Sequence, residues 1–187
     1  MAIILGPTSL AQWQSLVLEA EKNCSVHLDQ DTESYLVFLL MRFTEKPHMA
    51  NSVLGLEFLQ TVHEGGHASE EKLRDVGDKC LLFSGLFPGR AERRRVKISY
   101  FVKLGQAAYQ NLSDQSEHLA ALYYALCEKF VALMEVLQST REVSTASPGL
   151  NALQALSLWE DVKSPHALKT LQRYTRGTLI RGTEKIQ

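Results

Sequence analysis

Apolar residues recur every three or four positions along most of this chain, and that spacing places them on one side of an α-helix. The pattern is clearest between residues 73 and 112, where two such series flank a short corner at residues 86–90. The first series is Leu73, Val76, Cys80, Phe83 and Phe87, and the second is Ile98, Phe101, Gly105, Ala108 and Leu112. We therefore predict a helical hairpin around which the rest of the chain is organised.

Small residues interrupt both helices of this hairpin. Gly77, Gly85 and Gly105 lie inside helical patterns, where each glycine costs about 1 kcal/mol relative to alanine. Close approach of another backbone would explain them, and the alternative is that Gly85 and Gly89 only loosen the end of the first helix. Pro88 disfavours helix at the residue before it, so we expect the first helix to end near residue 86.

Three further helices are predicted before the hairpin. The first is capped by Thr8 or Ser9 and runs to about residue 23. The second starts at Asp29 or Asp31 and contains residues 35–41, which are apolar on every side. A buried strand would show the same pattern, but the flanking residues are helix formers, so we predict the central helix of the core. The third follows Pro47 and ends at the glycine pair 65–66.

After the hairpin, the pattern predicts one long helix that is capped by Ser113 or Asp114 and ends near Ser139. Residues 141–149 are rich in Ser and Thr and contain a Ser-Pro-Gly string, which is typical of a linker. A short helix follows, and Ser164 caps the last one.

Every element in this interpretation is helical. We predict an all-α fold, a compact bundle of about seven to eight helices with no significant sheet. Residues 1–140 form the main helical domain, residues 141–149 the linker, and residues 150–187 a C-terminal helical extension packed on the same core.

Part of the hairpin resembles a family of uncharacterised bacterial helical proteins. The resemblance rests on the string Leu-Phe-Ser-Gly-Leu-Phe-Pro at 82–88, the arginines that follow it, and the aromatic and small residues at 99–101 and 105–109. It covers about a fifth of the chain. It implies a bacterial origin, and no activity is carried over from it.

Composition and charge limit the function classes. The 187 residues carry a net charge of −1, which argues against a protein that coats nucleic acid with its whole surface. Residues 1–88 hold six Lys and Arg against twelve Asp and Glu, and residues 89–187 hold fourteen against nine. The first half is therefore acidic and the second half basic. The two halves can attract each other within one fold or between two copies, so a homodimer is plausible.

Neither the cysteines nor the chain start indicates an extracellular or membrane protein. Cys24, Cys80 and Cys127 are odd in number and far apart, which disfavours a disulfide scaffold. No signal peptide or membrane span is evident, so we predict a cytoplasmic protein with no membrane partner.

The string His63-Glu64-Gly65-Gly66-His67 matches the H-E-x-x-H pattern, in which two histidines bind zinc and the glutamate activates water. That chemistry needs one helix through all five residues and a third ligand. A glycine pair is a poor helix interior, and no clear third ligand follows, although Glu70, Glu71 and Asp78 are available. We therefore favour a loop, predict no cofactor, and keep a zinc-dependent hydrolase as an alternative. No nucleophile elbow or phosphate loop is present, so we lean against an enzyme.

The densest charge follows the corner of the hairpin. It is carried by Arg90, Arg93, Arg94, Arg95 and Lys97, with Tyr100 next to it. A basic connector of this kind is most often a solvated turn, and otherwise a contact for a phosphate group or an acidic partner. We predict a non-catalytic interaction protein that uses these six residues to contact a protein partner or a second copy of itself.

Two further alternatives remain open. Arginines beside aromatic residues are typical of single-strand nucleic-acid binding, but the helical period turns Phe101 inward and leaves only Tyr100 for stacking, so nucleic acid is disfavoured. A small ligand could instead bind between the second helix and the hairpin. The polar groups of that site would be the hydroxyls of Tyr35, Tyr109, Tyr123 and Tyr124.

Overall fold

The computed structural model describes residues 9–46, 67–93, 95–145 and 149–175. Within these ranges every regular element is a helix and no strand is present, which confirms the all-α prediction. The helices are α1 (Ser9–Cys24), α2 (Gln30–Glu45), α4 (His67–Gly85), α5 (Pro88–Arg93), α6 (Ile98–Gln115), α7 (Ala120–Glu128), α8 (Phe130–Thr145), α9 (Ala152–Val162) and α10 (Pro165–Thr175). The third predicted helix, after Pro47, lies outside the described residues.

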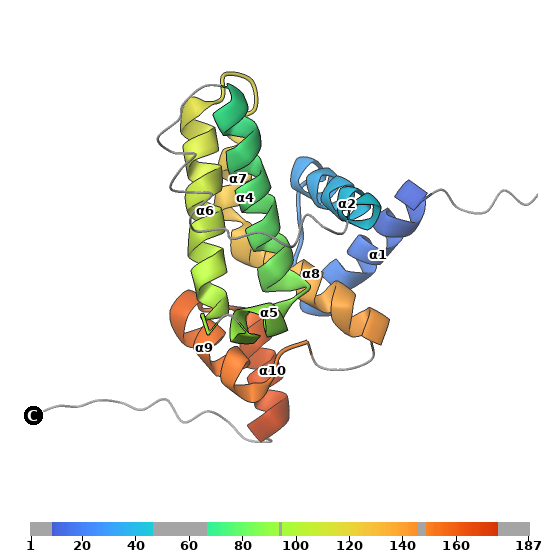
Figure 1. Cartoon of the computed structure of the whole chain (residues 1–187). Helices are drawn as coiled ribbons and strands as arrows, with labels where there is room; N and C mark the ends of the chain where they lie inside the picture. Colours follow the sequence, from blue (N-terminus) through green and yellow to red (C-terminus); the bar gives the residue numbers. More distant parts are fainter. Residues whose placement is uncertain (1–8, 47–66, 94, 146–148, 176–187) are drawn as a thin grey trace, which may run out of the picture.

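The predicted hairpin is the centre of the structure. α4 and α6 lie side by side and antiparallel (Figure 1), and α5 forms the corner between them. Val76, Phe83 and Phe101 from the predicted series are at most 1% exposed. The rings of Phe83 and Phe101 meet edge to face, with their centroids 5.3 Å apart. Apolar side chains from both helices thus form one continuous core.

The second predicted helix is present, but it is not central. As expected, Asp29 caps α2, because its carboxylate accepts a hydrogen bond from the Thr32 amide at 3.1 Å. The prediction that this apolar segment forms the central helix of the core is wrong, since α2 packs mainly on α1 and Phe38 is 58% exposed. An uninterrupted apolar run covers the whole circumference of a helix and does not reveal which faces are packed. Leu36 and Leu40 face the core, and Phe38 lies on the opposite side.

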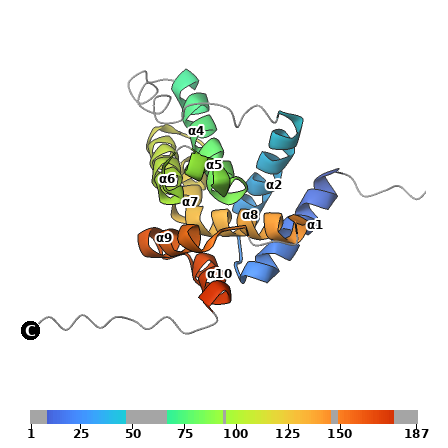
Figure 2. The same cartoon turned by 60° about the horizontal axis from the view of Figure 1, so that its bottom comes forward.

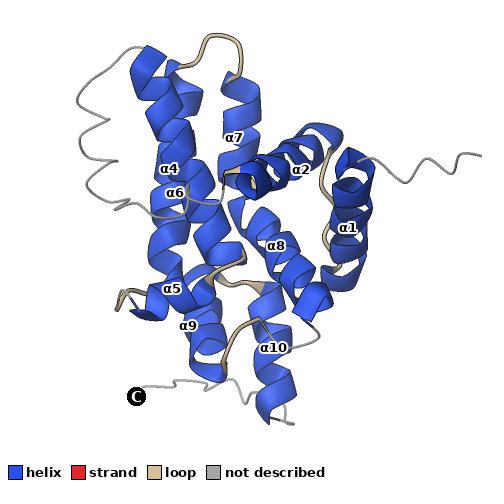
Figure 3. Cartoon of the chain, turned by 45° about the vertical axis from the view of Figure 1, so that its right-hand side comes forward, coloured by secondary structure: helices blue, strands red, loops and turns tan. Residues whose placement is uncertain are grey.

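The single long helix predicted to end near Ser139 is also wrong. The second hairpin helix, α6, continues past residue 112, where the apolar series ended, to Gln115. The chain then forms α7 and α8, which meet at Lys129. The apolar period continues through this junction because the Lys129 amide still bonds to the Ala125 carbonyl, and the Leu133 amide bonds to the Lys129 carbonyl. The two helices diverge in Figure 3, because α7 packs on α6 whereas α8 packs on α1 and α4. Periodicity alone does not report such a bend.

α9 and α10 lie together at one end of the molecule, next to α8 (Figure 2). Ser164 caps α10 as predicted, because its hydroxyl accepts a hydrogen bond from the Ala167 amide at 3.1 Å. The buried carboxylate of Glu135 on α8 accepts bonds from the Ser164 hydroxyl at 2.5 Å and the His166 amide at 3.2 Å. An anion at the positive end of a helix dipole is favourable, so Glu135 fastens α10 to the core.

The predicted linker is helical over its first half, since α8 extends to Thr145. Beyond it, the Gly149 amide bonds to the Glu142 carboxylate at 3.2 Å and the Gly149 carbonyl accepts from Arg141 at 2.9 Å. These contacts tie the far side of the linker back to α8. The division into a main domain and a C-terminal extension stays a prediction.

Candidate functional site

The H-E-x-x-H string lies almost wholly outside the described residues. Only the backbone of His67 is described, and it is the first residue of α4. Within the described ranges, no group of three or more His, Cys, Asp or Glu side chains is arranged to hold a metal ion. The zinc alternative at His63, Glu64 and His67 therefore gains no support and stays an untested prediction.

The basic corner is a short helix followed by a tight turn. α5 buries Ala91, which is 2% exposed, against the core. Arg95 has a φ of 55°, in the left-handed region that non-glycine residues rarely adopt. This conformation lets the Val96 amide bond back to the Ala91 carbonyl at 3.0 Å, which closes the helix. The sequence did not predict this turn, because no glycine marks it.

Arg90 packs within the fold. Its guanidinium lies over the rings of Phe83 and Phe87, 5.2 and 5.1 Å from their centroids. Such cation–π contacts contribute about 0.5–2 kcal/mol, depending on how far they are desolvated. Arg90 therefore fixes α5 on the end of α4 and offers less of its charge to a partner than its neighbours do.

Lys97 connects the corner to α9. Its ammonium lies 3.2 Å from the carboxylate of Asp161, which also accepts a hydrogen bond from the Ser99 hydroxyl at 2.6 Å. The bond from Ser99 and the charge of Lys97 together lower the pKa of Asp161. The partners are more than sixty positions apart, so no local signal in the sequence identified Asp161.

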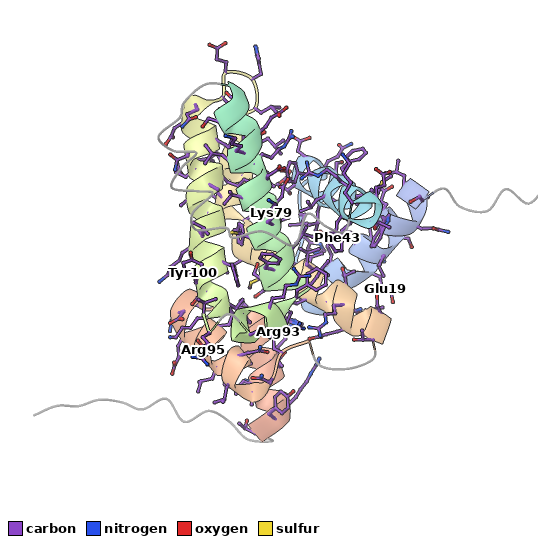
Figure 4. The ribbon with its side chains drawn as sticks, viewed as in Figure 1. Glu19, Phe43, Lys79, Arg93, Arg95 and Tyr100 are labelled. Carbon is purple, nitrogen blue, oxygen red and sulfur yellow. The ribbon has the colours of Figure 1, made fainter. Side chains whose placement is uncertain are left out.

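The side chains of Arg93, Arg95 and Tyr100 remain exposed. Figure 4 places Arg93 and Arg95 beside α5 and α9, with Tyr100 above them on the first turn of α6. Tyr100 is 43% exposed, whereas Phe101 is 1% exposed, as the helical period predicted. Arg94 lies outside the described residues. Among the six predicted contact residues, these three and Lys97 are exposed in the described structure, and Lys97 is the one that is paired with Asp161.

A pocket of about 220 Å³ opens beside this surface. One wall is formed by Ala91, Val96 and Ile98 of the corner, and the other by the first turns of α9, including Leu153 and Ser157. Sequence reasoning missed this pocket, because it exists only where two segments far apart in the chain meet.

The predicted tyrosine site has a different geometry from the one expected. The hydroxyls of Tyr35 and Tyr109 donate hydrogen bonds to the same oxygen of Asp78, at 2.6 and 2.7 Å, and Arg42 pairs with its other oxygen. The Tyr123 ring stacks on Tyr109, with centroids 6.5 Å apart, while Tyr124 is 53% exposed. The hydroxyls of Tyr35 and Tyr109 are thus already bound to the protein, and Tyr123 interacts with Arg74. The small-ligand alternative gains no support from them.

Tyr35, Arg42, Asp78 and Tyr109 form a cluster that joins α2, α4 and α6. Burial and the neighbouring groups act in opposite directions on the pKa of Asp78. Burial raises the pKa of Asp78, while Arg42 and the two phenols act in the opposite direction. Burial and the nearby carboxylate hold the pKa of both Tyr35 and Tyr109 well above the ordinary value. The phenols therefore remain protonated and act as donors.

The cluster predicts a loss of stability at alkaline pH. Because each phenol has a higher pKa folded than unfolded, its stabilisation is complete below about pH 10 and is lost as the pH rises further. Burial also raises the pKa of the Cys24 and Cys127 thiols, so we expect the urea midpoint to fall modestly from about pH 9. It should fall more steeply above about pH 10, where the phenols contribute. Phenolate absorbance should show that two of the six tyrosines ionise only on unfolding. A Tyr109→Phe variant should show a shallower dependence, and equal slopes for both proteins would contradict the assignment.

Comparison with known proteins finds no match: no family model, no curated protein and no solved structure is significantly similar to this chain. The resemblance to a bacterial family rests on the quoted hairpin residues alone, and a bacterial origin stays a prediction. No helix in the described ranges is both long and apolar enough to cross a bilayer. A cytoplasmic location stays a prediction too.

Proposed function

We propose that this chain is an interaction protein whose basic corner contacts an acidic surface on a protein partner, without a catalytic step of its own. The observation that carries the proposal is the exposure of Arg93 and Arg95 on a turn that is held in place from three sides. Ala91 is buried beneath it, Arg90 packs on two phenylalanine rings, and Lys97 is paired to α9. Charges on a rigid turn bind a partner with little loss of conformational entropy.

The chemistry favours a protein partner over nucleic acid. The chain has a net charge of −1, and a single basic patch neutralises few phosphates. Among the described residues of the corner, Tyr100 is the one exposed aromatic side chain, because Phe101 is packed in the core. Single-strand binders present several stacking rings in succession.

Self-association is the same proposal with a second copy as the partner. Residues 1–88 carry the acidic excess, so the corner of one molecule would contact the acidic half of another. Sedimentation at low salt separates the two cases, because a protein that stays monomeric at high concentration requires a different partner.

The test measures binding of a fluorescein-labelled pool of short acidic peptides, built from Glu, Asp, Ser, Gln and Ala, by fluorescence anisotropy. We expect the Arg93→Gln/Arg95→Gln variant to bind about fivefold more weakly than the wild type, since each rim charge contributes up to about 1 kcal/mol. The difference should shrink at about 0.3 M salt, because screening weakens surface charges.

The matched control is Lys22→Gln/Lys46→Gln, which removes the same charge from exposed positions on α1 and at the end of α2. It should bind like the wild type. Equal loss in both double variants would show a nonspecific charge effect, and no binding by the wild type would contradict the proposal. Tighter binding of a labelled oligothymidine would favour the nucleic-acid alternative instead.

A further inference from the structure

The pocket beside the basic corner has the dimensions of a single side chain. Its volume is about 220 Å³, whereas pockets that enclose drug-sized ligands and cofactors measure roughly 300–1,000 Å³. Four apolar residues, Ala91, Val96, Ile98 and Leu153, form its walls together with the polar residues Lys97, Asn151, Gln154 and Ser157, and most of the exposed lining surface is apolar. Small apolar pockets of this kind receive the anchor residues that dominate the energy of protein interfaces.

Basic residues of the corner lie next to the pocket, and one of them, Lys97, lines it. Arg93 and Arg95 are exposed at the corner, and Lys97 both lines the pocket and remains 64% exposed. Lys103 is close enough to act on Asp161, and that carboxylate is already held by Ser99 and Lys97. A partner that places an apolar side chain in the pocket therefore brings its neighbouring residues into a positive field.

The exposed apolar surface extends beyond the pocket. Leu153 at the start of α9 is 78% exposed, the largest exposed fraction among the large apolar side chains of the described residues. It stands at the pocket wall, where contact with a bound segment would remove it from water. An apolar centre bordered by charge is the usual anatomy of a protein interface.

From these features, we infer that the pocket between the corner and α9 accepts one leucine-sized side chain from an acidic segment of a partner protein. The inference rests on the proposed function and adds the chemistry of the partner: an apolar anchor flanked by Asp and Glu. The carboxylates of the segment lie over Arg93, Arg95 and Lys97, while the anchor fills the pocket. Charge complementarity selects the segment, and the anchor slows its release.

Ser157 provides a direct probe of the pocket. Its hydroxyl oxygen is buried and has no hydrogen-bond partner among the described residues, so replacing it removes no known hydrogen bond. We expect the larger side chain of Ser157→Leu to reduce the pocket volume from the α9 wall, because Ser157 lines the pocket. The matched control is Ser15→Leu, the same change at an exposed position on α1.

The experiment compares two labelled peptide pools with the full-length protein by fluorescence anisotropy. Both pools have randomised acidic flanks of Glu, Asp, Ser and Gln, and they differ only in carrying leucine or alanine at one fixed central position. We expect wild type to bind the leucine pool about tenfold more tightly than the alanine pool, which corresponds to about 1.4 kcal/mol. Ser157→Leu should lose this preference, and Ser15→Leu should keep it.

The outcomes separate this inference from the proposed function. Equal affinity of the wild type for both pools, together with weaker binding by Arg93→Gln/Arg95→Gln, overturns the anchor pocket and leaves the basic contact standing. Failure of both pools to bind overturns both. Circular dichroism checks that Ser157→Leu is folded. If the folded variant keeps the preference for leucine, the anchor binds elsewhere and the inference is also overturned.

Discussion

Asp78→Ala is expected to lower the free energy of unfolding by about 3–5 kcal/mol, the cost of removing one partner from a buried ion pair. Asp78 is fully buried and accepts hydrogen bonds from Tyr35 and Tyr109 as well as the charge of Arg42. Its loss would leave two phenol hydroxyls and a guanidinium without their acceptor. Urea unfolding followed by tryptophan fluorescence and circular dichroism measures the change.

The control for this prediction is Asp114→Ala, at the exposed end of α6, where the carboxylate only accepts a bond from Gln110. It should cost less than about 1 kcal/mol. Tyr109→Phe, which keeps the ring but removes one donor, should cost about 1 kcal/mol and remains measurable if Asp78→Ala does not fold. Similar losses for Asp78→Ala and Asp114→Ala would show that the cluster does not hold α2, α4 and α6 together.

Gly105→Ala is expected to destabilise the protein by about 1–3 kcal/mol, although alanine is the better helix former. A Cβ atom at residue 105 would lie 2.4 Å from a ring carbon of Phe130 and 2.9 Å from the Cβ of Cys80. Both neighbours are fully buried, so neither can move aside without disturbing the core. Thermal and urea unfolding of the variant test this expectation.

Gly89→Ala is the matched control, because no described atom beyond its chain neighbours and its own helix backbone lies within 4 Å of the Cβ it would add in α5. That variant should be as stable as the wild type or up to about 1 kcal/mol more stable. If the free energy of unfolding changes with the same sign and size in both variants, Gly105 is present for reasons other than packing.

These glycines illustrate what the sequence could and could not predict. Close approach was the expected reason for Gly77, Gly85 and Gly105, and the structure places neighbouring groups tightly against all three. The close neighbours are the side chains of Tyr109, Leu137 and Phe130, whereas the sequence had suggested a backbone. A small residue in a helical pattern indicates that space is short, but it does not identify what fills that space.

Local signals predicted the hairpin and the caps at Asp29 and Ser164, because period and capping depend on residues within a few positions of each other. The peripheral place of α2 and the junction at Lys129 depend on which helices pack together, and periodicity does not contain that information. The same limit applies to the candidate site. The sequence showed its exposed arginines as a run of charged residues. The Lys97–Asp161 pair and the pocket beside α9 could be found only from the three-dimensional structure.

The most direct test of the proposed contact is an amide nitrogen–proton NMR titration of the labelled protein with the acidic leucine pool. The pocket is lined by residues 91, 96–98, 151, 153, 154 and 157, so their amide signals should shift first and saturate together. Amides of α1 and α2 should remain unchanged. Shifts that are absent at the corner, or that concentrate on another face of the molecule, would contradict the account.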